Sequence, residues 1–241
     1  MKTTPWPLDS EVHLYCLAQP QDPAELTRLG SLLTASETVR AGLLKNESAR
    51  QRYLAGRGVL REILGGYLGV DAKTLQLAAG EHGKPFLVDD KGKLCFNLSH
   101  SGDKFLLAVA ANREVGVDIE RLAPGKPLRD MARMVFSPHE QDALSRLSSP
   151  HLEIAFYRSW VRKEACLKAC GRGFSLPSNS FDVSPPEDRT SVMMAYCNQQ
   201  YWQVLDLDVP PRYCAALAVE SYGANQTPPV VLRIDHHLSL K

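Results

Sequence analysis

The order of predicted secondary-structure elements repeats along this chain. Alternating apolar and polar residues predict a strand near residue 11, and the helical spacing of apolar residues predicts a long helix from about residue 47. A second strand begins near residue 115 and a second long helix near residue 150, so the strand-to-helix spacing is 36 residues and then 35. We therefore predict an α/β (α+β) fold, a pseudo-twofold pair of similar α/β subdomains.

This repeat sets the expected domain boundaries. We expect an N-terminal α/β half at residues 1–112, a C-terminal α/β half at residues 113–222 and a peripheral tail at residues 223–241. Both halves end in apolar strands, Leu107–Ala111 and Ala216–Glu220. The tail contains a solvated histidine pair, His236-His237, for which metal binding is the weaker interpretation.

Charge and cysteine content limit the function classes. The net charge of +1 gives no general attraction to nucleic acid or to an anionic membrane, so we expect neither as a partner. We find no signal peptide and no membrane-spanning segment in the sequence, which favours a cytoplasmic protein, and the duplication favours a monomer. The six cysteines form no C-x-x-C pair and are expected to be reduced, buried thiols.

Two segments place acidic and basic side chains in register. In Gly116–Glu120, aliphatic residues alternate with Asp118 and Glu120, so a strand presents both carboxylates on one side. In the helix of residues 150–170, Glu164 and Lys168 are four residues apart on one face, with Lys163 beside them. Taken alone, Glu164 and Lys168 could be a surface ion pair of about 0.2–0.5 kcal/mol.

A shared cleft would give these groups a chemical role. Three carboxylates repel one another unless a cation lies between them. Oxygen ligands favour Mg²⁺, with Mn²⁺ as a second possibility, and such an ion keeps positions for phosphate oxygens. Lys163 and Lys168 could neutralise the phosphate and the leaving group.

Other segments suit the binding of an anion. The segment Ser99-His100-Ser101 follows a short strand as a polar loop; it is no catalytic triad, but its hydroxyls, imidazole and amides can bind phosphate, and a plain turn is the competing interpretation. The helix of residues 46–68 carries Arg50, Arg52, Arg57 and Arg61, which could equally form a solvated basic face.

Five segments, in this order, resemble the 4′-phosphopantetheinyl transferases of the long, surfactin-synthetase-activating type. They are Gly83-Lys84-Pro85, Asn97–Ser101, Gly116–Glu120, Trp160–Lys168 and Gly173–Pro177. The resemblance spans roughly residues 40–220. It implies transfer of the phosphopantetheine arm of coenzyme A to a serine of an apo acyl or peptidyl carrier protein, with release of 3′,5′-ADP.

The resemblance also implies roles at the reacting end of the substrate. Asp118, Glu120 and Glu164 would be the Mg²⁺ ligands, and Glu164 would also be the base that activates the carrier serine. Lys168 would contact the pyrophosphate and Lys163 would support it. We expect direct transfer without a covalent enzyme intermediate.

At the nucleotide end, the implied contacts are more dispersed. Ser99 and His100 would bind the nucleotide phosphates, and the Gly83-Lys84-Pro85 turn would hold the adenine end. Arg52 would meet the 3′-phosphate, and Arg40 stands where the family pattern has a lysine.

Two alternatives from other classes remain open, and the partner surface is a separate hypothesis. A metal-dependent hydrolase of nucleotide pyrophosphates would use the same carboxylates, and a non-catalytic coenzyme A or carrier-binding module would keep the phosphate-binding segments.

In the predicted helix of residues 128–136, Arg129 and Arg133 edge an apolar stripe with Met134. The resemblance implies an acidic carrier, so these arginines are expected to steer it.

Overall fold

The structure is a computed structural model that describes residues 4–88, 93–183, 192–223 and 226–234. Within these ranges, no helix combines the length and the apolar character needed to cross a bilayer. The predicted loop at residues 185–188 and the pair His236-His237 lie outside the described residues.

The N-terminal half packs three helices against a sheet. Its helices are α1 (Pro23–Gly30), α2 (Ala35–Gly42) and α3 (Glu47–Leu68), with the short 3₁₀ turn η1 (Ala72–Thr74). Its strands are β1 (Glu11–Ala18), β2 (Leu77–Ala79), β3 (Pro85–Leu87), β4 (Leu94–Ser101) and β5 (Lys104–Ala111). The predicted turn at residues 81–86 joins β2 and β3 in a hairpin of its own.

The C-terminal half repeats this plan. Its helices are α4 (Leu128–Val135), α5 (Pro138–Ser145) and α6 (His151–Ala169), followed by the 3₁₀ turns η2 (Gly173–Ser175) and η3 (Ser178–Ser180). Its strands are β6 (Val115–Arg121), β7 (Met193–Cys197), β8 (Gln200–Asp206) and β9 (Tyr213–Ser221). A capping box between Ser137 and Glu140 begins α5, as the sequence predicts.

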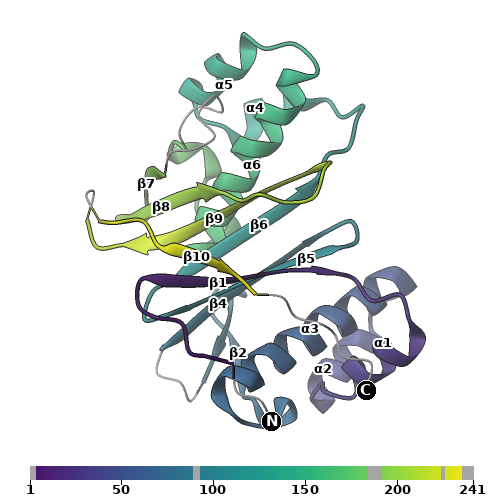
Figure 1. The fold of residues 1–241 in the computed structure, drawn as a ribbon. Coiled ribbons are helices and arrows are strands. Elements are labelled where there is room, and N and C mark those ends of the chain that lie inside the picture. Colours follow the sequence, from purple (N-terminus) through teal and green to yellow (C-terminus); the bar gives the residue numbers. More distant parts are fainter. Residues whose placement is uncertain (1–3, 89–92, 184–191, 224–225, 235–241) are drawn as a thin grey trace.

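Sheet order confirms the predicted pseudo-twofold α/β fold. One sheet runs β10-β1-β5-β4 and the other β6-β9-β8-β7, so β1, β5 and β4 correspond to β6, β9 and β8 (Figure 1). In each half the long helix begins 36 residues after the first strand, at Glu47 after Glu11 and at His151 after Val115.

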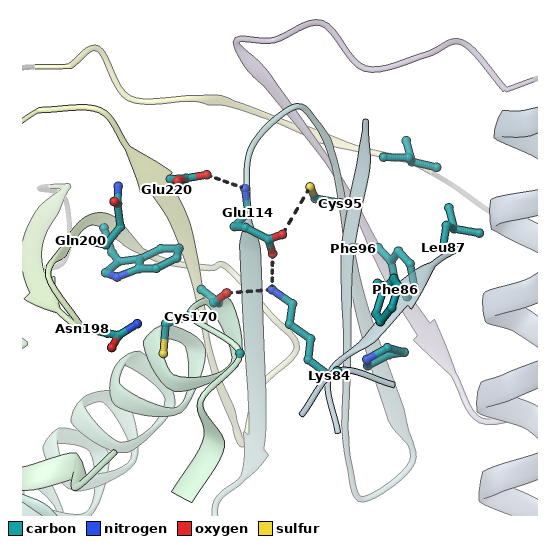
Figure 2. A pocket seen from close by; sticks show the side chains of 16 residues that line it. Lys84, Phe86, Leu87, Cys95, Phe96, Glu114, Cys170, Asn198, Gln200 and Glu220 are labelled. Atoms are coloured by element: carbon teal, nitrogen blue, oxygen red, sulfur yellow. Dashed lines mark hydrogen bonds and ion pairs between the residues drawn. The ribbon is translucent and has the colours of Figure 1, made fainter. Parts of the chain in front are cut away.

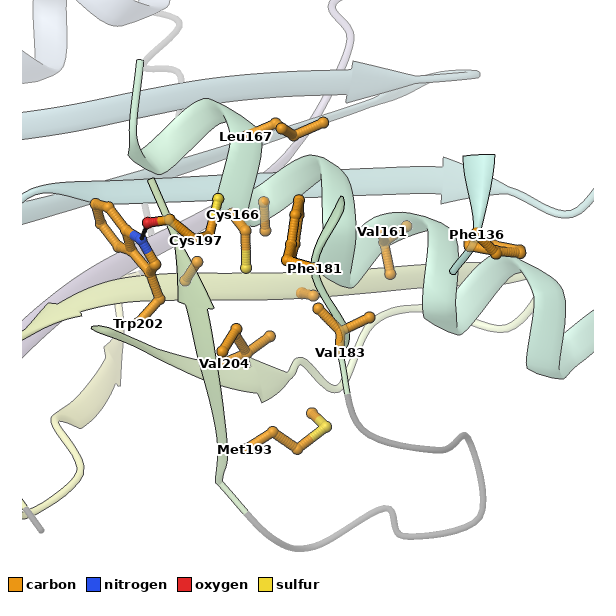
Figure 3. Packing of buried hydrophobic residues seen from close by; sticks show 14 of the residues in the cluster. Phe136, Val161, Cys166, Leu167, Phe181, Val183, Met193, Cys197, Trp202 and Val204 are labelled. Carbon is orange, nitrogen blue, oxygen red and sulfur yellow. Dashed lines mark hydrogen bonds between the residues drawn. The ribbon is translucent and has the colours of Figure 1, made fainter. Parts of the chain in front are cut away.

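Three apolar clusters form the core. One lies between α3 and the first sheet, one between the two sheets, and one between α6 and the second sheet. In the last, Phe181, Val183, Trp202 and Val204 pack around Cys166 of α6 (Figure 3). All six cysteines are free and four of them are buried; the expectation of burial is wrong for Cys16, whose side chain faces solvent on β1.

Three segments differ from the sequence prediction. Ser99 and His100 lie on β4, not in a loop, because their backbones pair with Leu106 and Phe105 of β5. Residues 174–183 are not simply extended, since η2 and η3 interrupt them. The segment after residue 222 contributes a strand that the pattern did not predict, β10 (Val230–Arg233), which pairs in parallel with β1.

Candidate active site

A pocket of about 300 Å³ lies where β4, β6 and α6 meet. Its lining residues are Leu98, Ser99, His100, Asp118, Glu120, Trp160, Glu164 and Lys168. The pocket therefore collects the acidic strand, the acidic helix face and the serine–histidine segment that the sequence analysis singled out separately.

Local geometry explains why these side chains converge. On β6, Asp118 and Glu120 are two residues apart and share one side of the strand, as predicted. On α6, Trp160, Glu164 and Lys168 follow one another at intervals of four and share one face, also as predicted. Contacts between β4 and β6 bring Ser99 and His100 to the same place.

Lys168 joins the helix to the strand. Its Nζ lies 2.5 Å from Asp118 Oδ1 and donates to Ser99 Oγ at 2.9 Å. The Ser99 hydroxyl in turn donates to Asp118 Oδ1 at 2.8 Å. In the described structure, Lys168 thus pairs with a carboxylate of β6, and not with Glu164 of its own helix as the alternative interpretation of a surface ion pair would require.

Burial governs the electrostatics of the three carboxyl groups. Desolvation raises the pKa of Asp118, and the nearby Lys168 opposes that rise. Desolvation also raises the pKa of Glu120, and for Glu164 desolvation acts together with the charge of Asp118. The three groups are therefore costly to keep ionised together, and a cation placed among them would relieve that cost.

Polar side chains of β4 attach it to β6. Asn97 Oδ1 accepts a hydrogen bond from the backbone amide of Val117 at 2.9 Å. Ser101 Oγ donates to Glu120 Oε2 at 2.7 Å and accepts from the amide of Arg121 at 3.0 Å. With the bond from Ser99 to Asp118, these contacts mean that alternate residues of β4 orient both carboxylates of β6.

The carboxylates fit a hard divalent cation in their chemistry. Asp118 Oδ2 is buried and has no hydrogen-bond partner in the described structure, so it is an acceptor left for a ligand. Glu120 and Glu164 line the same pocket with further oxygen atoms. As the side chains lie, however, no three acidic, histidine or cysteine groups among the described residues are arranged to hold a metal ion. Lys168 occupies the other oxygen of this carboxylate, Asp118 Oδ1.

A second pocket, of about 440 Å³, is basic. Arg40, Arg57 and Tyr53 line it together with Gly83 and Pro85 of the predicted nucleotide turn. The Arg40 guanidinium lies over the Tyr53 ring, 5.8 Å from its centroid. Helices α2 and α3 and the β2–β3 hairpin thus bring Arg40 to the predicted turn.

Arg52 and His100 are near neighbours across the surface between α3 and β4. Burial lowers the pKa of His100, and the positive charges of Arg52 and Lys168 lower it further. Arg52 Nε is buried without a hydrogen-bond partner in the described parts of the chain. The position therefore combines the positive charge of Arg52 with an imidazole whose neutral form is favoured.

Two lysines that the sequence analysis assigned to substrate binding, Lys163 and Lys84, line neither of these two pockets. Lys163 points to another, buried side of α6, where its Nζ lies 2.9 Å from Glu140 Oε2 and donates to the carbonyls of Ser178 and Phe181. Lys84 Nζ is bound by the carboxylate of Glu114 and the carbonyl of Ala169 (Figure 2), and also by the carbonyl of Val115.

Sequence reasoning missed three contributions to these pockets. It did not assign Tyr53 to a site, and it listed Arg57 only as part of a basic face. It also did not foresee that Ser99 holds Asp118. The alternation of Asn97, Ser99 and Ser101 on a strand is the signal that could have indicated this role.

Comparison with known proteins defines the family. A profile described as the 4′-phosphopantetheinyl transferase superfamily matches residues 114–218, and one described as 4′-phosphopantetheinyl transferase, N-terminal, matches residues 19–114. The chain is 36% identical to the 4′-phosphopantetheinyl transferase HetI of Nostoc over 90% of both proteins. It is 33% identical to a phosphopantetheinyl transferase of Thraustochytrium over 84% of this chain and 75% of that protein.

A further similarity, 27% identity over 70% of this chain and 74% of the other protein, is to the 4′-phosphopantetheinyl transferase Sfp of Bacillus subtilis. The fold and site thus define an α/β transferase with an acidic pocket between two related halves. The chain belongs to the 4′-phosphopantetheinyl transferase superfamily.

Proposed function

We propose that this protein transfers the 4′-phosphopantetheine moiety of coenzyme A to a serine hydroxyl of an apo acyl or peptidyl carrier protein, releasing 3′,5′-ADP. The observation that carries the proposal is the pocket in which Asp118, Glu120, Glu164 and Lys168 converge, in a chain that belongs to this superfamily. Attack on a pyrophosphate requires a positioned nucleophile and neutralised phosphate oxygens, and this set of groups suits both needs.

At the reacting end, each residue has a distinct task. Asp118, Glu120 and Glu164 would hold Mg²⁺, or Mn²⁺, which supplies neutralisation of the pyrophosphate charge. Lys168 lies within the same pocket and would stabilise the charge that develops on the departing 3′,5′-ADP. Glu164, at the rim on α6, would accept the proton of the carrier serine.

The nucleotide end would lie along the N-terminal half. Arg52 would supply a cationic group and His100 a hydrogen-bonding group for the 3′-phosphate. Arg40 and the backbone of Gly83 to Pro85 line the basic pocket, which would receive the adenine end. Ser99 would reach phosphate only through Lys168, because its hydroxyl is bonded to Asp118.

The partners follow from this chemistry. We infer that coenzyme A and an apo carrier protein are the two substrates and that the protein is a cytoplasmic monomer. Residues 1–112 and 113–222 would act together as one pseudodimer. The net charge of +1 supports the absence of a nucleic acid or membrane partner.

A panel of apo carrier proteins tests the proposal. The protein is mixed with coenzyme A, MgCl₂ and one apo carrier from fatty acid, polyketide or nonribosomal peptide synthesis, and the carrier mass is followed. We expect the mass gain of one phosphopantetheine on at least one carrier. Absence of a gain on every carrier contradicts the proposal, and release of phosphopantetheine without any carrier would instead indicate a pyrophosphate hydrolase.

A further inference from the structure

The two elements that carry the acidic pocket touch at Gly116. A Cβ atom at this position of β6 would lie 2.2 Å from the carbonyl oxygen of Ala165 and 2.3 Å from the amide nitrogen of Ala169, both on α6. Only a glycine permits this approach of helix and strand. Asp118 follows the contact by two residues and Lys168 precedes Ala169 by one, so this crossing sets the spacing between the two charged groups.

Lys84 binds both elements at the same crossing. Its Nζ donates to the carbonyl oxygen of Val115, at 3.0 Å, and to that of Ala169, at 2.8 Å. Val115 precedes Gly116 on β6, and Ala169 is the last residue of α6. The lysine therefore joins the start of the acidic strand to the end of the helix that bears Lys168 (Figure 2).

The helix end has a physical need for this cation. The last carbonyl groups of an α-helix lack partners within the helix, and the helix dipole concentrates negative charge there. The ammonium group of Lys84 donates to the carbonyl oxygen of Ala169, and its positive charge is attracted by the negative charge at this end of the helix. Glu114 adds an ion pair, with Oε2 at 2.5 Å from Lys84 Nζ.

These contacts use the donors of the ammonium group. Lysine has three N–H donors, and Lys84 has three acceptors: the carboxylate of Glu114 and the carbonyls of Val115 and Ala169. Its stem packs on Gly171, with Cδ 3.6 Å from the position of a Cβ atom there, and its side chain is only 16% exposed. The ammonium is thus committed to the protein and not directed at a substrate phosphate.

We propose that Lys84 is a positioning residue of the transferase: from the β2–β3 hairpin of the N-terminal half, it fixes the C-terminal end of α6 against β6, so that Lys168 and Asp118 hold their spacing. The expected effect on the rate of transfer rests on the proposed function, whereas the expected effect on the end of α6 does not. It replaces the expectation that the Lys84 side chain contacts coenzyme A; the backbone of the Gly83-Lys84-Pro85 turn keeps its place beside the basic pocket.

A nucleotide-binding role and a positioning role for Lys84 predict different kinetic changes. A lysine that binds the nucleotide contributes to the affinity for coenzyme A. A lysine that positions α6 contributes to the transfer step, because a small displacement of a reacting group costs up to about a hundredfold in rate. Lys84→Met, which keeps the packing of the stem and removes the ammonium, separates these outcomes.

The experiment compares Lys84→Met and Lys84→Arg with the wild type and with Lys73→Met, a control at an exposed lysine of the same half. Three quantities are measured: hydrogen exchange of the backbone amides in residues 165–171, the Kd of coenzyme A without carrier, and kcat for carrier modification. For Lys84→Met we expect faster exchange at the end of α6, a Kd within about twofold of wild type, and a kcat lower by roughly ten- to a hundredfold. Lys84→Arg keeps a cation at the helix end and should recover part of both losses, and Lys73→Met should match the wild type.

Two results would overturn the proposal. Unchanged exchange at residues 165–171 would show that Lys84 does not hold the helix end, and a tenfold weaker Kd with unchanged kcat would return Lys84 to the nucleotide site. If Lys84→Met does not fold, Glu114→Gln, which weakens the same contact and leaves the lysine in place, must show the exchange effect in smaller measure. If the wild type modifies no carrier, the proposed function fails, whereas the exchange data still decide the role of Lys84.

Discussion

The two halves of this protein share one topology but not one chemistry. Counted from the first residues of β1 and β6, the position of Asp118 corresponds to Leu14, and counted along α3 and α6, Glu164 and Lys168 correspond to Leu60 and Leu64. All three leucines are buried in apolar clusters. The same strand and helix positions thus build a core in one half and a charged pocket in the other.

This difference indicates how a duplicated fold divides its work. The N-terminal half keeps one side of its long helix packed in the core and carries cations such as Arg52 and Arg57, both half-buried, on the other side. The C-terminal half gives up apolar contacts near the end of α6 for the carboxylates and Lys168. We expect substitution of the charged groups of the C-terminal half to affect the transfer step, and substitution of the matching buried leucines of the N-terminal half to affect stability.

The carboxylates test this division most strongly. Asp118→Asn or Glu164→Gln should lower kcat/KM for carrier modification by at least about a hundredfold, the effect of losing one preorganised electrostatic group at a reacting centre. The near-isosteric changes keep the side-chain volume, so the circular dichroism spectrum should not change. Glu47→Gln, at the exposed start of α3, is the matched control and should keep wild-type activity. Wild-type turnover by either site variant at saturating Mg²⁺ would remove that residue from the site.

The two lysines of α6 sharpen the comparison between packing and chemistry. Lys163→Met leaves buried Glu140 without its cation and should reduce the free energy of unfolding by about 3–5 kcal/mol, the usual cost of breaking a buried ion pair. The kcat of the folded fraction should stay within about threefold of wild type. Lys168→Met should lower kcat by at least about a hundredfold.

Urea unfolding and initial rates at saturating coenzyme A measure these two quantities for both variants. A Lys163→Met protein of wild-type stability and low kcat would mean that Lys163 reaches the substrate after all.

Arg52 tests whether the N-terminal half supplies the nucleotide contact. Arg52→Ala should weaken coenzyme A binding by about tenfold, since a charge-assisted bond to phosphate is lost, and should leave dephospho-coenzyme A, which lacks the 3′-phosphate, unaffected. Arg50→Ala is the control from the same helix, because Arg50 is exposed and paired with Glu47. Calorimetric titration of the wild type and both variants with both donors gives six affinities. Equal weakening of both donors by Arg52→Ala would place the 3′-phosphate elsewhere.

Sequence periodicity was sufficient to predict which acidic side chains share a face within each element, and the family resemblance, not the periodicity, implied that the two faces meet. The twofold period of β6 and the helical period of α6 fix which side chains share a face, so Asp118 with Glu120, and Glu164 with Lys168, follow from the pattern alone. The same rule bears on Lys163. It lies one residue before Glu164, about 100° around the helix, and the apolar residues three and four positions further on, Cys166 and Leu167, indicate the buried side on which it is found.

Other contacts depend on segments that only the fold brings together. Lys84 reaches Glu114 and Ala169, which are 30 and 85 residues away in sequence. The Ser99–Asp118 bond depends on how the two sheets face each other, and no local pattern records that. Strand β10 pairs in parallel with the edge that β1 would otherwise leave open, and this pairing between residues more than 200 positions apart in sequence is what the local pattern does not record.

The smallest expected effect concerns the carrier surface on α4, where the structure separates two arginines that the sequence treats alike. Arg129 donates to the carbonyl of Leu147 at 2.9 Å and, more weakly, to that of Ser145, so it supports the end of α5. Arg133 is 73% exposed, pairs with Asp130 one turn earlier and stands beside Met134, which is 77% exposed.

We therefore expect Arg133 to carry most of the attraction for an acidic carrier, because its charge is accessible and Arg129 is already engaged. Arg133→Glu should raise the carrier KM about fivefold at low salt and flatten its salt dependence, with the coenzyme A KM unchanged. Arg50→Glu makes the same charge change on the other half and should leave the carrier KM as it is. An equal rise for both variants would show that net charge, and not a docking face on the C-terminal half, guides the carrier.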